Sequence, residues 1–240
     1  MPTPLRARLQ LDRLTRGIRE LSFPQVCCVC GAHTRSGAAY VCLRCRATLR
    51  TLDLHTLPDN EITDRFWARL PVARAAALLP YRRGTPAEKV MHALKYDNRP
   101  DVGVSLGAWF GMILAGSSVF GPVDAIVPVP LHPARERQRG YNQAERIGAG
   151  LAHTLEAPCL AHAVRRTRHT QTQTRMSQFE RMENMEGVFA LAHASPLHGR
   201  HVLLVDDVLT TGATLEAVGR EVLKAAPASI KIATLALARK

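Results

Sequence analysis

A run of four apolar residues, followed by two acids and a hydroxyl-rich turn, constrains this chain more than any other feature. The run, Val202 to Val205, predicts a strand that is buried on both faces. Asp206 and Asp207 come next, and a turn of Thr, Gly and Ala occupies residues 210–214. Apolar residues then recur with helical spacing over 215–223. The pattern predicts a buried strand, a tight turn and a helix, in that order.

The turn at 210–214 predicts an anion site, because backbone N–H groups at a helix start and Thr hydroxyls together bind phosphate. The acid pair would repel a phosphate, so it suits a sugar diol or a divalent metal instead. Two adjacent acids at the end of a buried strand are costly unless something binds there. The alternative is an ordinary strand, turn and helix with a Thr N-cap.

In order and spacing, these residues resemble the phosphoribosyl pyrophosphate (PRPP) site of the type I phosphoribosyltransferases. The resemblance implies that the Thr-Thr-Gly-x-Thr turn holds the 5′-phosphate and that the acid pair contacts the ribose 2′- and 3′-hydroxyls. It also implies an α/β fold with a Rossmann-like central parallel sheet flanked by helices. The residues expected to bind PRPP in this part of the chain are Asp206, Asp207, Val208, Thr210, Thr211, Gly212, Ala213 and Thr214.

A basic segment follows a second predicted strand at residues 125–127. Ligands of parallel α/β sheets bind outside the carboxyl ends of the strands, so this segment is expected at the ligand site. Arginine suits bidentate phosphate contacts, and with Mg²⁺ the segment would hold the pyrophosphate of PRPP. The alternative is a solvated basic loop. The candidates are Pro130 and Leu131 in the turn, then Arg135, Arg137 and Arg139 at alternate positions; Arg137 and Arg139 join Asp206 and Asp207 as catalytic candidates.

A polar stretch over residues 165–186 is rich in Gln, Thr and Arg and almost without aliphatic residues. Long loops inside a compact domain are usually either functional or disordered. This one lies between two predicted strands of the site, so we expect a lid that excludes water from a reactive sugar. His169 is an acid–base candidate, although a lone loop histidine is more often exposed. The expected lid residues are Arg166, Arg168, Thr170 and Gln173.

Two Cys-x-x-Cys pairs, separated by 11 residues, predict a structural metal site. Each pair places two thiolates on one small loop, and two pairs complete a tetrahedral site that leaves no open position for chemistry. In a cytosolic protein this spacing favours metal over disulfides. The expected ligands of one structural Zn²⁺ are Cys27, Cys30, Cys42 and Cys45, with Cys28 as a bystander and Cys159 as a core thiol.

Taken in order, these motifs resemble the ComF family of bacterial competence and DNA-utilisation proteins. The resemblance covers residues 20–238 and is weakest over 46–80. It implies a zinc ribbon joined to a phosphoribosyltransferase domain, with a competence helicase and recombination-mediator proteins as partners. It is carried by Phe23-Pro24 with the two cysteine pairs, Leu94-Lys95-Tyr96, Pro-Val-Pro-Leu-His with Arg-x-Arg-Gly-Tyr-Asn-Gln, the loop from Thr170 to Asn184, and the acid-pair motif.

Three parts are expected along the chain. Residues 1–50 would form an N-terminal helix and the zinc ribbon, residues 51–120 a linker or hood with helices, and residues 121–240 the PRPP-binding core. A capping box from Thr85 to Glu88 opens one of the helices. The expected helices span about 85–95, 101–114, 142–155 and 214–226, and the expected strands lie at 125–127, near 160, at 202–205 and at 230–237.

The formal charge of +12, with 27 Arg among 32 basic residues, favours polyanionic partners such as nucleic acid or pyrophosphate-bearing small molecules. GC-rich codon use is the alternative source of the scattered arginines. No apolar run approaches the length of a membrane-spanning helix, and residues 1–19 lack the apolar core of a secretory signal. We therefore expect a cytoplasmic protein that does not insert into membranes.

Three functions remain open at this point. The first is a phosphoribosyltransferase, with an acceptor that the sequence does not reveal, acting in DNA uptake or utilisation. The second is a non-catalytic partner of the competence helicase that binds single-stranded DNA; an aromatic content of 5% favours backbone contacts over base stacking. The third is a PRPP-sensing regulator, ranked last because the sequence contains no recognisable helix-turn-helix.

Overall fold

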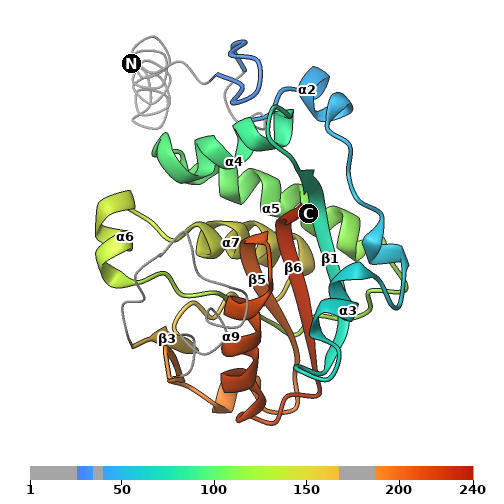
Figure 1. Cartoon of the computed structure of the whole chain (residues 1–240), viewed down its shortest axis with the longest axis vertical. Helices are drawn as coiled ribbons and strands as arrows, with labels where there is room; N and C mark the ends of the chain where they lie inside the picture. Colours follow the sequence, from blue (N-terminus) through green and yellow to red (C-terminus); the bar gives the residue numbers. More distant parts are fainter. Residues whose placement is uncertain (1–25, 35–39, 168–186, 240) are drawn as a thin grey trace, which may run out of the picture. The chain divides into compact units, whose positions relative to one another are not determined.

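The computed structural model describes residues 26–34, 40–167 and 187–239 (Figure 1). The chain divides into two compact units, residues 1–48 and residues 49–240, and each is described by itself. In the first unit, the described elements are a single bridge between Val26 and His33 and the helix α2, Leu43–Thr48. The predicted hood residues, 51–120, lie within the second unit.

A parallel sheet of four strands forms the centre of the second unit. The strands are β1 (Val72–Tyr81), β2 (Ala125–Pro128), β5 (His201–Leu209) and β6 (Ser229–Ala238), in the order β1-β6-β5-β2. All neighbouring pairs run parallel, and the register places Val205 beside Pro128 on one side and Ala233 on the other. Together with the helices that flank it, this sheet confirms the predicted α/β fold class.

Helices cover both faces of the sheet (Figure 1). One face carries α4 (Pro86–Tyr96), α5 (Pro100–Ala115) and α7 (Gln143–Leu155), and the other carries α3 (Glu61–Phe66) and α9 (Ala213–Leu223). Leu204 of β5 joins Phe66 and Val218 in the core under α3 and α9. Since side chains alternate along a strand, Val205 faces α7 instead. None of the described helices is long and apolar enough to cross a membrane.

Shorter elements complete the second unit. They are η1 (Leu54–Thr56), α6 (Pro133–Arg139), β3 (Val164–Arg166), β4 (Phe189–Leu191) and η2 (Ser195–Leu197). β3 and β4 pair antiparallel on either side of residues 168–186. That segment lies outside the described residues, and so do the predicted lid residues Arg168, Thr170 and Gln173, together with His169.

The basic segment predicted as a loop is a helix, α6. Pro133 occupies its first turn, the His132 ring accepts a hydrogen bond from the Ala134 N–H, and Gly140 ends it with a φ of 82°. Because residues four apart share a helix face, Arg135 and Arg139 project on one side and Arg137 projects on another. The alternation in sequence therefore does not align the three arginines.

The predicted N-terminal helix lies outside the described residues; the other predicted helices and strands are found, with three further differences. β1 has no predicted counterpart, because its Ala-rich sequence carries a helical preference that pairing with β6 overrides. The short strand expected near residue 160 is a single bridge between Cys159 and Ile126. α4 begins after Thr85 as predicted, but Thr85 caps no helical N–H and Glu88 accepts from the N–H of Gly84, so the capping box does not form.

Candidate functional site

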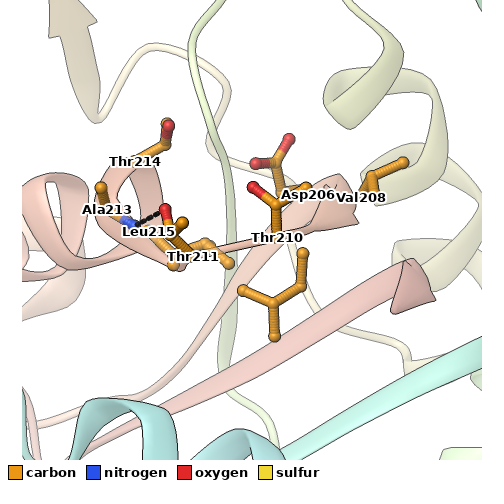
Figure 2. Close-up of a pocket in the computed structure, with 9 residues that line it drawn as sticks. Asp206, Val208, Thr210, Thr211, Ala213, Thr214 and Leu215 are labelled. Carbon is orange, nitrogen blue, oxygen red and sulfur yellow. Dashed lines mark hydrogen bonds between the residues drawn. The ribbon is translucent and has the colours of Figure 1, made fainter. Parts of the chain in front are cut away.

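The turn after β5 forms a pocket at the amino end of α9 (Figure 2). Asp206 and residues 208–215 line it, so the pocket contains the whole hydroxyl-rich motif together with the first acid. Thr211 and Thr214 are half-buried, Thr210 is exposed, and the Thr211 hydroxyl accepts a long hydrogen bond of 3.4 Å from the Ala213 N–H. N–H groups at a helix start lack partners within the helix, so this pocket suits an anion.

Gly212 determines the shape of the turn. Its φ of 86° lies in the left-handed region, and a Cβ atom there would lie 2.8 Å from Cζ of Phe66. On the same side, Arg65 of α3 donates hydrogen bonds to the carbonyl oxygens of Thr210 and Ala238. The turn is therefore held between α3 and the start of α9, with no room for a side chain at residue 212.

The two acids leave β5 on opposite faces of the sheet. Asp206 has the orientation of Leu204 and lines the pocket at the start of α9, whereas Asp207 has that of Val205 and faces α4. There, Nζ of Lys95 lies 3.1 Å from Oδ2 of Asp207. The backbone N–H of Asp207 donates to Oδ1 of Asp206 at 2.8 Å. One acid therefore lines the pocket at the start of α9, and the other pairs with a lysine at the carboxyl end of α4.

The Asp206 carboxyl group is electrostatically strained. Burial, and then the charge of Asp207, raise its pKa from 3.8 to about 7. The hydrogen bond from Asp207 and the charges of Lys95 and Arg166 oppose this rise without cancelling it. A perturbed carboxyl group that lines a pocket is typical of a functional site.

Lys95 is a site residue to which the sequence assigns no role. In the sequence, it is part of Leu94-Lys95-Tyr96, one of the segments that carry the family resemblance. The sequence does predict the helix that carries Lys95, and Val90, Met91 and Leu94 on its apolar face are buried as expected. That pattern fixes the buried face of α4, but it does not reveal that the last turn reaches Asp207.

The turn after β2 lies against the end of β5. The N–H of Val129 donates to the carbonyl oxygen of Val205 at 2.8 Å, and the Asn142 side chain donates to the carbonyl oxygen of Val129 at 3.1 Å. Pro130 is buried in this turn and Leu131 is half-buried. The structure therefore places both predicted turn residues beside the strand that carries the acids.

Arg139 is the α6 arginine whose contacts are best defined. Its Nη1 donates to Oε1 of Gln143 at 3.1 Å, and its guanidinium carbon lies 5.8 Å from the centre of the Tyr96 ring. Gln143 is buried, and within the described part of the chain its Nε2 has no hydrogen-bond partner. An anion or a water at this turn would satisfy that N–H group. Arg137 is exposed.

Arg166 is the predicted lid residue that the structure describes. It is half-buried, with its guanidinium carbon 5.4 Å from the centre of the Phe189 ring. Burial, and then the charge of Arg135, lower the pKa of Arg166, while Asp206 raises it. Arg166 is therefore one of the cations that act on Asp206, together with Lys95.

In the first unit, the four predicted ligand thiols gather into one cluster. Their Sγ atoms all lie within 4.8 Å of one another, and those of Cys30 and Cys42 are 3.8 Å apart. Two ligands of a tetrahedral zinc ion at about 2.3 Å would be separated by about 3.8 Å. The members are Cys27, Cys30, Cys42 and Cys45. The cluster fits the predicted structural Zn²⁺.

Backbone N–H groups donate to two of these thiols, whereas burial raises the pKa of Cys45. The N–H groups of Cys42 and Cys45 donate to the Sγ atoms of Cys27 and Cys42, both at 3.4 Å. Burial opposes ionisation of Cys27, but hydrogen bonds outweigh it and lower its pKa to about 6. Cys28 is not a member of the cluster, and its N–H donates to the carbonyl oxygen of Tyr40.

Comparison with known proteins agrees with this geometry. The family model described as the phosphoribosyl transferase domain matches residues 142–240, which contain α7, β5, the turn at residues 210–214, α9 and β6. With the parallel sheet, this match defines the second unit as a domain of the phosphoribosyltransferase fold. The relatives are more specific: the chain is similar to proteins named Competence protein F, Competence protein ComFC and DNA utilization protein YhgH.

Three relatives illustrate the range of similarity. Competence protein F of Haemophilus influenzae is 40% identical over 116 residues, 48% of this chain and 51% of that protein. DNA utilization protein YhgH of Escherichia coli strain K12 is 29% identical over 223 residues, 88% of this chain and 96% of that protein. Competence protein ComFC of Bacillus subtilis is 35% identical over 111 residues, 46% of this chain and 43% of that protein. The matched region thus spans about half of the first relative and nearly all of the second.

Solved structures give weaker matches. Glutamine PRPP amidotransferase from B. subtilis, complexed with ADP and GMP, is 17% identical with a TM-score of 0.41; the match covers 60% of this chain and 30% of the amidotransferase chain. Purine phosphoribosyltransferase from Pyrococcus horikoshii Ot3 is 20% identical with a TM-score of 0.32 and covers 63% of this chain and 73% of its own.

Proposed function

We propose that the second unit binds a phosphoribosyl ligand, PRPP or a close relative, at residues 206–214. The observation that carries this proposal is one pocket in which Asp206 of the core strand β5 meets the hydroxyl-rich turn at the start of α9. Helix-start N–H groups and Thr hydroxyls suit the 5′-phosphate. The acids suit the ribose, because their carboxylate oxygens can accept hydrogen bonds from its hydroxyl groups.

The neighbouring turn is the proposed site of the pyrophosphate. It runs from Val129 to Leu131, and its hydrogen bond to Val205 fixes it beside the acid pair. Arg139 and the unpartnered Nε2 of Gln143 supply a charge and a buried donor at this turn. Arg137, exposed on α6, stays a predicted pyrophosphate contact.

Magnesium is expected to accompany the ligand, where it neutralises the charge of the pyrophosphate. The acid pair itself does not fit a bare Mg²⁺ ion, because Lys95 already pairs with Asp207 and burial raises the pKa of Asp206. We therefore assign no catalytic step to a metal held by this chain.

The reaction class that this site supports is phosphoribosyl transfer. The bond from C1 of the ribose to pyrophosphate breaks, the acceptor forms a new bond at C1, and the transition state carries positive charge on the sugar. Such a reaction needs positioning and charge stabilisation more than acid–base chemistry. Asp206 and Asp207 would position the sugar, and Arg139 and Gln143 would stabilise the leaving pyrophosphate. The lid over residues 165–186 stays a prediction.

The cellular process we propose is natural competence or DNA utilisation, after the names of the relatives Competence protein F and DNA utilization protein YhgH. The cysteine cluster would hold one structural Zn²⁺ that stabilises the first unit. Single-stranded DNA, a competence helicase and recombination mediators stay predicted partners.

A binding module without catalysis is the second candidate. The formal charge of +12 favours it, because charge-driven contacts with DNA phosphates need no catalytic residue. Such binding weakens steeply as salt rises, whereas a pocket that recognises a sugar phosphate by directed hydrogen bonds is less sensitive. A PRPP-sensing regulator ranks third.

A pyrophosphate-release screen over free bases and amines, run beside single-stranded DNA titrations at two salt concentrations, separates these candidates. Release with one acceptor supports the transferase. Salt-sensitive oligonucleotide binding without release for any acceptor supports the binding module. Asp207→Asn should weaken PRPP binding by about tenfold or more, and Asp101→Asn, an exposed acid of α5, is the matched control. Equal PRPP affinity of wild type and Asp207→Asn by calorimetry would refute the site.

A further inference from the structure

Each acid of the pair has one carboxylate oxygen held by the protein. Oδ1 of Asp206 accepts from the N–H of Asp207 at 2.8 Å, and Oδ2 of Asp207 lies 3.1 Å from Nζ of Lys95. Among the residues described, no donor contacts Oδ2 of Asp206 or Oδ1 of Asp207. Each of the two adjacent acids therefore keeps one acceptor oxygen that a hydroxyl donor of a ligand can use.

Lys95 is held at this position by more than its partner. It lies in the last turn of α4, where the helix dipole favours a cation. The helix is anchored by Val90, Met91 and Leu94, which are all buried. The side chains of Lys95 and Asp207 are only 25% and 17% exposed, so solvent and salt screen the pair weakly.

Within the described part of the chain, Arg166 of β3 adds a second positive charge that acts on Asp206. A bare divalent cation between the acids would meet Lys95 at the oxygen it needs and would be repelled by Arg166 as well. A neutral diol meets no such repulsion and needs only the two remaining oxygens.

We propose that Lys95 is a specificity-determining residue: it makes Asp206 and Asp207 a receptor for a vicinal diol and excludes bare divalent cations. The diol half of this inference rests on the proposed function, because the diol is that of a ribose 5-phosphate group. By pairing with Oδ2 of Asp207, Lys95 leaves Oδ1 of that carboxylate for the sugar. A divalent metal then enters only when it is already bound to the phosphates of the ligand.

The test uses the full chain, supplied with Zn²⁺ so that the cysteine cluster is filled. Mn²⁺ alone is titrated by electron paramagnetic resonance, and ribose 5-phosphate and 2-deoxyribose 5-phosphate are titrated by calorimetry without metal. Lys95→Met and Lys95→Gln remove the charge, Lys95→Arg keeps it, and Lys89→Met removes an exposed charge from the same helix. Circular dichroism reports whether each variant is folded.

Wild type, Lys95→Arg and Lys89→Met are expected to bind Mn²⁺ at least about tenfold more weakly than Lys95→Met or Lys95→Gln. The Mn²⁺ site gained by Lys95→Met should disappear in the double variant Lys95→Met/Asp207→Asn. Wild type should prefer ribose 5-phosphate over the deoxy sugar by about tenfold, and the neutral variants should lose most of that preference.

Equal Mn²⁺ affinity in wild type and the neutral variants overturns the inference, and so does a gained Mn²⁺ site that survives Asp207→Asn. Wild-type binding of Mn²⁺ at Asp207 overturns it even when the neutral variants do not fold. If wild type ignores ribose 5-phosphate while the Mn²⁺ contrast holds, the diol site and the proposed function are refuted and cation exclusion by Lys95 stands.

Discussion

The charge of Asp206 opposes folding, so Asp206→Asn should stabilise the protein at neutral and higher pH. Burial and the charge of Asp207 raise the Asp206 pKa from 3.8 to about 7. Between these pH values the folded protein keeps a proton that the unfolded chain has released. The free energy of unfolding therefore falls as pH rises through this interval and stays low above it. Asn carries no charge and can still accept the hydrogen bond from the Asp207 N–H.

The size of the effect follows from the shift. About three pKa units at about 1.4 kcal/mol each give an upper value of about 4 kcal/mol. The real value is smaller, because Asp206 is only half-buried and because it titrates together with its charged neighbours. We expect Asp206→Asn to raise the free energy of unfolding by about 1–3 kcal/mol at about pH 8 and to have little effect near pH 4.

Urea unfolding followed by circular dichroism at several pH values measures this difference. The neighbouring acid provides the control at about pH 5, where Asp206 is protonated and is not repelled by Asp207: Asp207→Asn leaves the half-buried Lys95 without its partner, so it should lower stability by about 0.5–1 kcal/mol. Two adjacent, chemically identical substitutions are thus expected to act in opposite directions. An Asp206→Asn variant that gains nothing at about pH 8, or gains equally at all pH values, would refute the argument from burial of charge.

Three further predictions concern the phosphate turn, the cysteine cluster and a buried lysine. Gly212→Ala should lower stability by about 1–3 kcal/mol and abolish ribose 5-phosphate binding, because the added methyl group clashes with Phe66 and the φ of residue 212 disfavours alanine. Gly84→Ala is the control, since Gly84 has a similar φ of 76° but no atom near its added Cβ. Urea unfolding measures the stability of the two variants, and calorimetry measures their binding. Elemental analysis should find about one zinc per chain; Cys30→Ser should lose it and Cys28→Ser should keep it, whereas zinc in Cys30→Ser would contradict the assigned ligands. Burial, and then repulsion by Arg74, lower the Lys231 pKa from 10.5 to about 8. The free energy of unfolding of the wild type should therefore rise as the pH increases from about 8 to 10.5, and that of Lys231→Met should not. Urea unfolding at several pH values measures this difference.

The parts of the molecule that could be predicted are those whose information is local. The phosphate turn is such a case, because β5, residues 210–214 and α9 follow one another in the chain. The cysteine cluster is another, since each pair lies on one small loop and the chemistry of four thiolates fixes the rest. Gly212 was predicted as part of the motif, but its clash partner Phe66, 146 positions earlier, was not.

The parts that could not be predicted depend on contacts between distant segments. The Ala-rich β1 carries a helical preference, and it becomes a strand only because β6 offers it a parallel edge. Lys95 lies on a correctly predicted helix, yet its contact with Asp207 depends on how α4 packs on the sheet. Gln143 is the first residue of α7, and nothing local indicates that Arg139 holds its oxygen and leaves its N–H group unpartnered.

The electrostatics of this corner also rank the proposed functions. A strand that served stability alone would gain from apolar residues in place of Asp206 and Asp207, since the charge of one acid opposes folding and the other requires a half-buried cationic partner. A DNA phosphate would be repelled by the same two acids, so DNA recognition gives them no purpose at this position. A sugar that bears both a phosphate and a vicinal diol uses the hydroxyl-rich turn and both free carboxylate oxygens. If the chain also binds DNA, the contact must therefore lie on surfaces other than residues 206–214, and Asp207→Asn should weaken sugar-phosphate binding by about tenfold or more while leaving oligonucleotide affinity unchanged.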